Sequence, residues 1–597
     1  MAVDVDEVTR TNGNDPRPAM PLRQRRGLPA AWLILSLLGG CTAGCSAATV
    51  FPGGDAYALS GGHLTKPVVP PRTLFGAYLA GNFAATHHDD SSALSYYSLI
   101  LRHDPGNGII AERGLSVAVD AGRFDLAVPL VRQILKHDQT MPLANLVEAA
   151  ADLKARDPDQ AVAAAKRLPE QGIYALFGSL VTAWCLTAEG PAGMHDVPAA
   201  LAPLRQDPEL SVLATLNAAI MEDLADQKDA ADRDYRAALG SSSPPLRLAE
   251  LAGNFWERNG KRAQADALYK AFAQGAGSAA GMAPHLSAGV PARLIATPAQ
   301  GLAEAMFEIA GLAAAAGAPD TSLVATRLSL MLHPDFPQAQ FTLADILAAR
   351  GQLDDARLAY RAISPSSPLA WEARLAEVDL LLKLHHPDEA AGVLKDLMAA
   401  RPDQVEPVIM LGDLKRGSGD MAGAIAAYDR ALGMLGPDAA PAQLGGLYFS
   451  RGAAREQSGQ WREGEADLRH ALALVPGNPE LLNYLGFAMV LRDENLPAAR
   501  VLIERAVEAQ PNEGAYVDSL GWADFHLHQC HLATTELEHA IQLWPSNAEV
   551  NDHLGDAYWR CGRKSDAKLQ WRRALSLDPD PALAKSIHAK LGAGTAP

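Results

Sequence analysis

Four residues of types that ligate metals lie close together near the C-terminus. The cluster consists of His526, His528, Cys530 and His531. Imidazole and thiolate groups at short spacing are typical zinc ligands. Histidine pairs also occur at His87–His88 and His385–His386, and all of these sites fall at the same turn of a repeated sequence pattern. Such turns are exposed and favour polar residues, so the sequence predicts polar turns rather than a metal site.

A second pattern, Gly275-x-Gly277-x-x-Ala280, superficially fits a glycine-rich loop that binds a dinucleotide. Such a loop follows a β-strand, whereas the residues before Gly275 carry a helical pattern. The sequence contains no Gly-x-Ser-x-Gly, Walker or His-Glu-x-x-His motif. No spacing ties its Ser, His and Asp residues into a triad. We therefore expect no catalytic residues, no cofactor and no enzyme activity.

The elements that position these residues follow a 34-residue repeat. The last unit has small, small, large and proline positions at Gly555, Ala567, Trp571 and Pro579. One period earlier the same positions hold Gly521, Ala533, Leu537 and Pro545. This resembles the tetratricopeptide repeat (TPR), in which small residues let two helices touch and a large residue fills the gap between neighbours. The sequence predicts an all-α solenoid of TPR helical hairpins, with no sheet of domain size.

The repeat phase can be followed along most of the chain and gives roughly 13 to 15 repeats. Gly486, Ala499 and Ile503 fit it with a one-residue insertion. A segment rich in glycine and proline interrupts the phase near the middle and is the place where we expect a hinge or block boundary. We expect an N-terminal block at 74–274, an inter-block loop at 275–300, a C-terminal block at 301–580, and a capping helix and tail at 581–597.

Residues 1–41 are interpreted as an N-terminal extension and signal peptide. Arginines at 23, 25 and 26 precede an apolar run, which ends in Leu38-Gly39-Gly40-Cys41. This order is that of a secretory signal, and Cys41 resembles the lipidated cysteine of a bacterial lipobox. Met20 suits the start of such a signal better than the acidic residues before it. Residues 42–73 have the composition of an extended tether.

Three alternatives to lipidation at Cys41 stay open. Cys45 closes a poorer second lipobox, an uncleaved signal would anchor the chain in the inner membrane, and a plain secretory signal would release the chain without an anchor. In each case the arginines stay inside, so the repeats cross the inner membrane. We expect a periplasm-facing outer-membrane lipoprotein, with an inner-membrane anchor as the alternative.

Composition limits the kinds of partner. The net charge of −17 argues against nucleic acid, which would require a basic face. The five cysteines are too few and too scattered to predict a disulfide framework.

A stripe on the first helices of the last three repeats is the predicted protein-binding groove. In the repeat phase these positions are spaced i, i+4, i+7 and face the concave side. The predicted stripe consists of Asn483, Phe487, Val490, Asp518, Trp522, Phe525, Asp552, Asp556 and Trp559. Aromatic residues are typical interface anchors, and carboxylates could hold an extended segment. In the alternative, the aromatic rings pack on each other or against the C-terminal helix.

The C-terminal third is more specific than a generic repeat. Its distinctive motifs are Leu482-Asn483-Tyr484-Leu485-Gly486-Phe487, Asp518-Ser519-Leu520-Gly521-Trp522 and Asn551-Asp552-His553-Leu554-Gly555-Asp556. Over about 445–580 they resemble a family of proteobacterial TPR lipoproteins. Some members are outer-membrane adaptors that hold a periplasmic carboxy-terminal processing protease and deliver cell-wall hydrolases to it. The resemblance implies a non-catalytic adaptor for such proteins. The alternative is a structural scaffold for an envelope or secretion complex, without client delivery.

Overall fold

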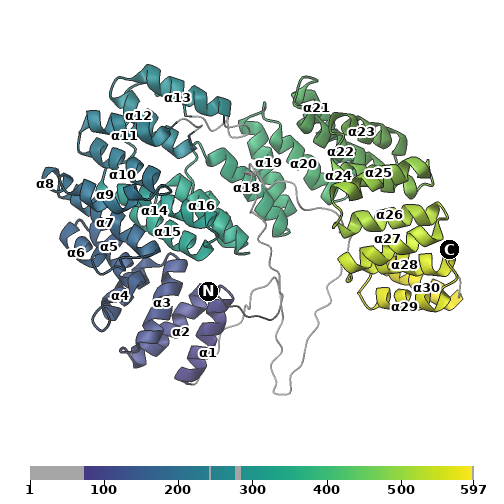
Figure 1. Ribbon diagram of the computed structural model, residues 1–597, viewed down its shortest axis with the longest axis horizontal. Coiled ribbons are helices and arrows are strands. Elements are labelled where there is room, and N and C mark those ends of the chain that lie inside the picture. Colours follow the sequence, from purple (N-terminus) through teal and green to yellow (C-terminus); the bar gives the residue numbers. More distant parts are fainter. Residues whose placement is uncertain (1–72, 241–243, 276–283, 594–597) are drawn as a thin grey trace, which may run out of the picture. The chain divides into compact units, whose positions relative to one another are not determined.

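The computed structural model describes residues 73–240, 244–275 and 284–593, and its regular structure there is helical (Figure 1). Across these ranges there is no strand, so the predicted all-α fold is confirmed. Met20, Cys41, Cys45 and the tether before residue 73 lie outside the described residues. In the part of the chain that is described, no helix combines the length and the apolar character needed to cross a bilayer.

The helices pack chiefly against their neighbours in the sequence, as expected for stacked hairpins. The first half contains α1 (Leu74–Thr86), α2 (Asp90–His103), α3 (Gly108–Asp120), α4 (Phe124–Ile134), α5 (Pro142–Lys154), α6 (Pro158–Ala165), α7 (Ile173–Ala188), α8 (Pro191–Met194), α9 (Val197–Gln206), α10 (Ser211–Leu224), α11 (Lys228–Leu239), α12 (Leu246–Arg258), α13 (Arg262–Gly275), α14 (Pro298–Ala315) and α15 (Pro319–Leu332).

The second half continues in the same way. It contains α16 (Pro337–Ala349), α17 (Leu353–Arg361), α18 (Ala370–Lys383), α19 (Pro387–Ala400), α20 (Glu406–Gly417), α21 (Met421–Leu435), α22 (Pro441–Gln457), α23 (Trp461–Leu474), α24 (Pro479–Val490), α25 (Leu496–Ala509), α26 (Gly514–His526), α27 (Cys530–Leu543), α28 (Ala548–Arg560), α29 (Lys564–Leu575) and α30 (Pro581–Ala593).

In hairpins with glycine at the first small position, the small-to-large spacing read from the sequence is a close contact between the two helices. A β-carbon at Gly412 would lie 2.5 Å from the Tyr428 ring on the next helix. A β-carbon at Gly486 would lie 2.6 Å from Ile503, which follows with the predicted one-residue insertion. Only glycine lets these helix pairs come so close, so the repeat phase is confirmed.

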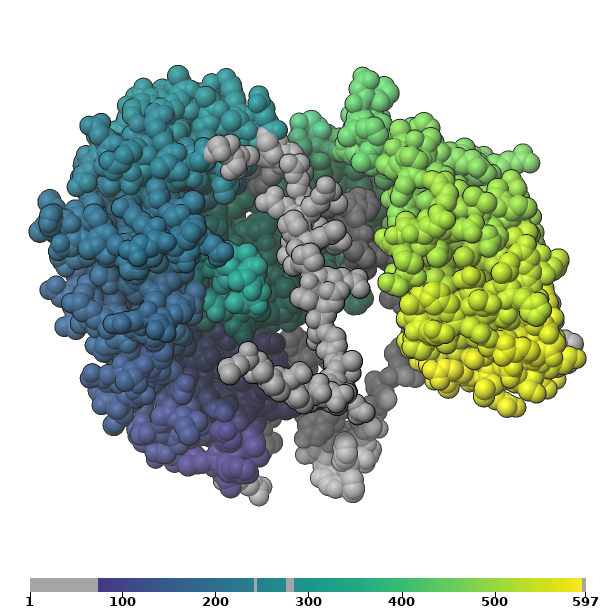
Figure 2. Space-filling model, in the orientation of Figure 1, coloured from purple at the N-terminus to yellow at the C-terminus, as the bar shows by residue number. Residues whose placement is uncertain are grey.

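The apolar core does not divide at the segment where we expected a block boundary. A single cluster of buried side chains runs from Ala77 to Leu332. It exists because α14 packs on α5, α7 and α10, and α15 packs on α3 and α5. A side chain at Gly301 of α14 would collide with the buried ring of Trp184 on α7. Figure 1 shows α14 and α15 beside α5, α7 and α10, and Figure 2 gives the surface in the same orientation.

The described part of the predicted loop, 284–297, is irregular but is held against the preceding repeat. The Asn254 side-chain amide donates to the Ala292 carbonyl at 2.9 Å, and the Ser287 backbone N–H donates to Glu257 at 2.8 Å. Arg293 pairs with Asp226 at 2.8 Å. These bonds tie the segment to α12 and to the end of α10.

Candidate protein-binding site

The nine residues of the predicted stripe lie on α24, α26 and α28, the first helices of three consecutive hairpins. They divide by exposure. Five are buried, namely Val490, Asp518, Phe525, Asp552 and Asp556. The other four are half-buried, namely Asn483, Phe487, Trp522 and Trp559.

The carboxylate of Asp518 is paired inside the protein. Its oxygens lie 3.0 and 3.1 Å from Nδ1 of His553, which is also buried. Burial alone would lower the pKa of His553, but the Asp518 carboxylate outweighs it and raises the pKa to about 9. At neutral pH the two residues therefore form a buried ion pair between α26 and α28.

Asp552 and Asp556 are used in the same way by the C-terminal helix. Lys590 of α30 donates to both carboxylates at 2.7 Å, and its own side chain is buried. The indole N–H of Trp571 donates to Asp556 at 3.0 Å. Burial, together with the nearby Asp552, raises the pKa of Asp556 above its usual value. The three carboxylates thus do not line a solvated groove, because each is taken up by a cation of the chain itself.

The aromatic members of the stripe are partly engaged in internal packing. Trp522 stacks on Phe525 at 4.6 Å and on His553 at 3.9 Å between ring centroids. Trp559 packs at 5.4 Å against Trp571, which is fully buried. The packing alternative therefore describes Phe525, whereas Trp522 and Trp559 are half-buried residues that also take part in this packing.

What stays accessible is a row of three half-buried aromatic rings on successive repeats. We call Phe487 (α24), Trp522 (α26) and Trp559 (α28) the aromatic row. Trp522 and Trp559 are held in place by the contacts above, whereas Phe487 is not among the side chains that pack against the core clusters of these repeats. Large rings that are already held in place lose little conformational entropy on contact with a partner. That this row binds a protein is still a prediction.

The candidate metal residues are divided among other contacts. His526 pairs with Asp493 at 2.7 Å, and the His531 carbonyl accepts bonds from two threonines. His88, His385 and His528 share a left-handed backbone conformation, with φ of 56°, 59° and 61°, at equivalent turns. The described residues contain no group of three or more His, Cys, Asp or Glu arranged to hold a metal ion.

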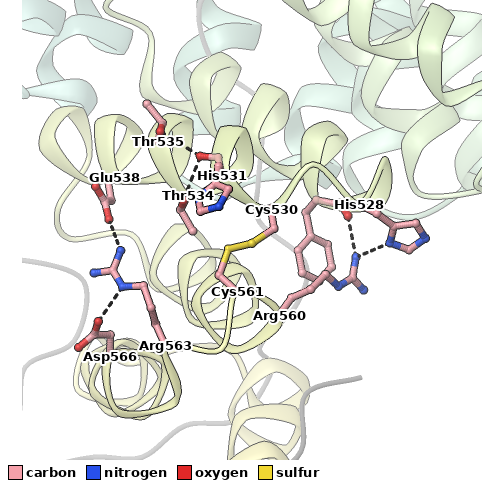
Figure 3. Close-up of a disulfide and its surroundings, with 11 residues drawn as sticks. His528, Cys530, His531, Thr534, Thr535, Glu538, Arg560, Cys561, Arg563 and Asp566 are labelled. Carbon is pink, nitrogen blue, oxygen red and sulfur yellow. Dashed lines mark hydrogen bonds and ion pairs between the residues drawn. A yellow bond between two sulfur atoms is a disulfide. The ribbon is translucent and has the colours of Figure 1, made fainter.

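Cys530 forms a disulfide with Cys561, and the sequence analysis did not predict it (Figure 3). The bond joins the start of α27 to the turn that follows α28, with 5.6 Å between the two Cα atoms, an ordinary disulfide separation. The two cysteines are 31 residues apart, close to one repeat period. Two cysteines near equivalent turns of successive repeats were the signal that could have revealed the bond.

Comparison with known proteins agrees with the hairpin geometry. Models of the tetratricopeptide repeat match residues 322–370 and 375–443, and another matches 548–581. Together with the closely packed hairpins, they define the chain as a TPR-repeat solenoid. Proteins of this class generally act as non-catalytic scaffolds that bind other proteins.

The similar proteins found by these comparisons do not define a class narrower than TPR-repeat proteins. A TPR repeat-containing protein of Pseudomonas aeruginosa is 30% identical over 198 residues, which make up 33% of this chain. The match spans 32% of that curated relative. The solved structure of the APC/C hetero-tetramer Cut9–Hcn1 is similar, with a TM-score of 0.37 and 16% identity over 82% of this chain and 96% of that one. YrrB, described as a TPR protein with an unusual peptide-binding site, has a TM-score of 0.27 and 21% identity over 34% of this chain and 98% of that one. These likenesses to solved structures are of fold alone.

Proposed function

We propose that this protein is a non-catalytic scaffold on the periplasmic side of the bacterial envelope that recruits other proteins through its C-terminal repeats. The aromatic row of Phe487, Trp522 and Trp559 carries the proposal. Three successive hairpins each present one partly accessible ring, and aromatic side chains supply much of the energy at protein interfaces. Because the three rings are spread over three consecutive hairpins, they suit an extended segment or a helix of a partner better than a small molecule.

The internal pairing of the carboxylates changes the chemistry expected of the partner. Asp518 pairs with His553, whereas Asp552 and Asp556 share the single cation Lys590. Because all three carboxylates are buried and internally bonded, they offer little to a ligand. We expect recognition to rest on apolar contacts with the aromatic row, and to depend only weakly on salt concentration.

The proposed location rests on two features of the sequence and one of the fold. The arginine-rich start and Cys41 fit an exported lipoprotein held in the outer membrane, with an uncleaved inner-membrane anchor as the alternative. The Cys530–Cys561 disulfide supports export, because disulfides persist in oxidising compartments and are rare in the cytosol.

The proposed clients follow from the resemblance of residues 445–580 to TPR lipoproteins that act as adaptors. They are a periplasmic carboxy-terminal processing protease and cell-wall hydrolases. The test is a pull-down from detergent-solubilised envelopes, followed by identification of the captured proteins. Capture of a protease together with a hydrolase supports an adaptor. Capture of envelope or secretion components alone would replace it with a structural scaffold.

The same pull-down, carried out with variants, tests whether the aromatic row is the binding surface. Phe487→Ala should weaken capture by about 30-fold or more, which corresponds to ~2 kcal/mol for one interface anchor. Leu569→Ala is the matched control, because Leu569 is 64% exposed on α29 of the same C-terminal repeats. Equal capture by both variants and the wild type, with unchanged melting temperatures, would exclude the aromatic row as the binding surface.

A further inference from the structure

The first helix of the solenoid carries an exposed apolar stripe. Phe75, Leu79 and Phe83 of α1 are 69%, 51% and 57% exposed. They are spaced i, i+4, i+8 and so lie on one face of the helix. We call these three residues the terminal stripe. Phe75 and Phe83 are the only phenylalanines among the exposed large hydrophobic side chains of the described residues.

The terminal stripe lies opposite the face that joins α1 to the rest of the fold. Ala77, Gly81 and Ala84 are the buried residues of α1. A β-carbon at Gly81 would lie 2.8 Å from the Tyr97 ring of α2. In an interior repeat, the second helix of the preceding hairpin would cover the opposite face, as α2 covers α3. Because α1 is the first described helix, its outer face lacks this cover in the described part of the chain.

The C-terminal end of the solenoid is finished differently. Helix α30 directs Ile587, which is fully buried, towards the core of the last repeats. Lys585 and His588 on the same helix are exposed. A repeat solenoid requires terminal units with a polar outer face to stay soluble. The C-terminal end meets this requirement, whereas the N-terminal end presents two phenylalanines and a leucine.

We propose that the terminal stripe binds the same stripe of a second copy of this chain, with the two α1 helices antiparallel. The order Phe75–Leu79–Phe83 reads the same in both directions about Leu79. An antiparallel pair with a two-fold axis at Leu79 therefore places Phe75 of each copy against Phe83 of the other. Such self-complementarity is what an isologous dimer interface requires.

Charge also favours a second copy. Helix α1 contains no Asp, Glu, Lys or Arg, so two copies can approach without repulsion between their stripes although the chain carries a net charge of −17. A partner membrane would be a poorer match, because helices that lie on membranes usually bear a basic polar face, and α1 has none.

The small area of the terminal stripe limits the expected affinity of the dimer. A 13-residue helix is about 20 Å long, so its one face is far smaller than the ~800 Å² per partner of a typical stable complex. We therefore expect a weak, reversible dimer. The inference does not depend on the proposed client-binding function, since it concerns the opposite end of the solenoid.

Cysteine cross-linking in native membranes tests the geometry, with Cys45→Ser as the background. Leu79→Cys should form a disulfide-linked dimer on oxidation, because the axis brings the two positions together. Phe75→Cys alone should not, since its two copies would lie about 12 Å apart along the helices. Co-expressed Phe75→Cys and Phe83→Cys should again give a dimer. Leu358→Cys, 65% exposed on α17, is the matched control and should stay monomeric.

Sedimentation of the purified full chain supplies a second measurement. The wild type should show a concentration-dependent monomer–dimer equilibrium, and Leu79→Asp should shift it to monomer with unchanged circular dichroism. Failure of Leu79→Cys to cross-link would overturn the proposal. If a maleimide reagent is also excluded from position 79 in the monomer, then the membrane or the chain's own N-terminal segment covers the stripe instead, and the dimer is likewise excluded.

Discussion

His553 and Asp518 form a buried charged pair, and the Trp522 ring stacks on His553. The pKa of His553 is about 9 in the folded chain against a usual 6.5. The folded state therefore binds the proton more tightly than the unfolded state. The ion pair of His553 with Asp518 therefore stabilises the fold fully below pH 6.5, and this stabilisation is lost as pH rises through about 9.

Because the pKa of His553 is raised in the folded state, we predict that the protein loses stability as pH rises. The melting temperature of the C-terminal repeats, followed by tryptophan fluorescence, should fall between pH 6.5 and pH 9. The corresponding loss in unfolding free energy is on the order of 3 kcal/mol at most. His553→Gln should be less stable than the wild type at pH 6.5 and should lack this pH dependence. If the two pH profiles were parallel, the buried ion pair would not exist in solution.

Lys590 is the second residue on which the C-terminal repeats depend. Lys590→Met leaves Asp552 and Asp556 buried without a cation, and breaking a buried pair in this way typically costs about 3–5 kcal/mol. Lys585→Met, at an exposed position of the same helix, should be nearly neutral. Urea unfolding of both variants gives the comparison, and equal midpoints would contradict the placement of α30 as a cap.

At the scale of helices, the contact between Gly412 and Tyr428 sets how closely the two helices of one hairpin pack. Gly412→Ala places a methyl group 2.5 Å from the Tyr428 ring, and overpacking of this kind costs about 1–3 kcal/mol. Gly433, on the other helix of the same hairpin, has nothing within 4 Å of an added β-carbon. Gly433→Ala should therefore stabilise the chain by up to ~1 kcal/mol. A lower melting temperature for Gly412→Ala and a higher one for Gly433→Ala would confirm the close packing at Gly412. Equal shifts in melting temperature would contradict it.

The Cys530–Cys561 bond staples two successive hairpins. It closes a loop with a sequence separation of 31 residues, and bonds of this kind usually stabilise by about 2–4 kcal/mol. Reducing agent should lower the melting temperature of the wild type and should leave the Cys530→Ser/Cys561→Ser double variant unchanged. Mass spectrometry of the unreduced protein should find peptides containing the two cysteines joined. Free thiols at both positions in the unreduced protein would argue against the bond.

The sequence predicted the hairpins well because their determinants are local. Gly555 and Trp571 are 16 residues apart in the sequence and touch within one hairpin. The pairing of Lys590 with Asp552, and the packing of α14 on α7, join residues from different hairpins. The repeat pattern does not show which residues of different hairpins meet. The burial of the stripe carboxylates could therefore not be predicted from the sequence. The role of Phe487, Trp522 and Trp559 in a groove is still a prediction, whereas the stacking of Trp522 on Phe525 agrees with the packing alternative.

At the scale of the whole molecule, the two ends of the solenoid differ in chemistry. The C-terminal end is closed by α30, and the repeats just before it present the aromatic row. The N-terminal end begins with an uncharged helix whose outer face is apolar. A chain with these features can associate with its own copy at one end and hold a partner at the other, which suits a scaffold.

The central claim is that the aromatic row binds a partner protein, and photocross-linking in living cells tests it most directly. A photoreactive phenylalanine is placed at Phe487, and in a parallel strain at the exposed Leu569 of α29. We predict that light yields a defined larger adduct from position 487 that contains another envelope protein, and none from position 569. No adduct from position 487, in a strain where the protein is folded and present at its normal level, would contradict the claim.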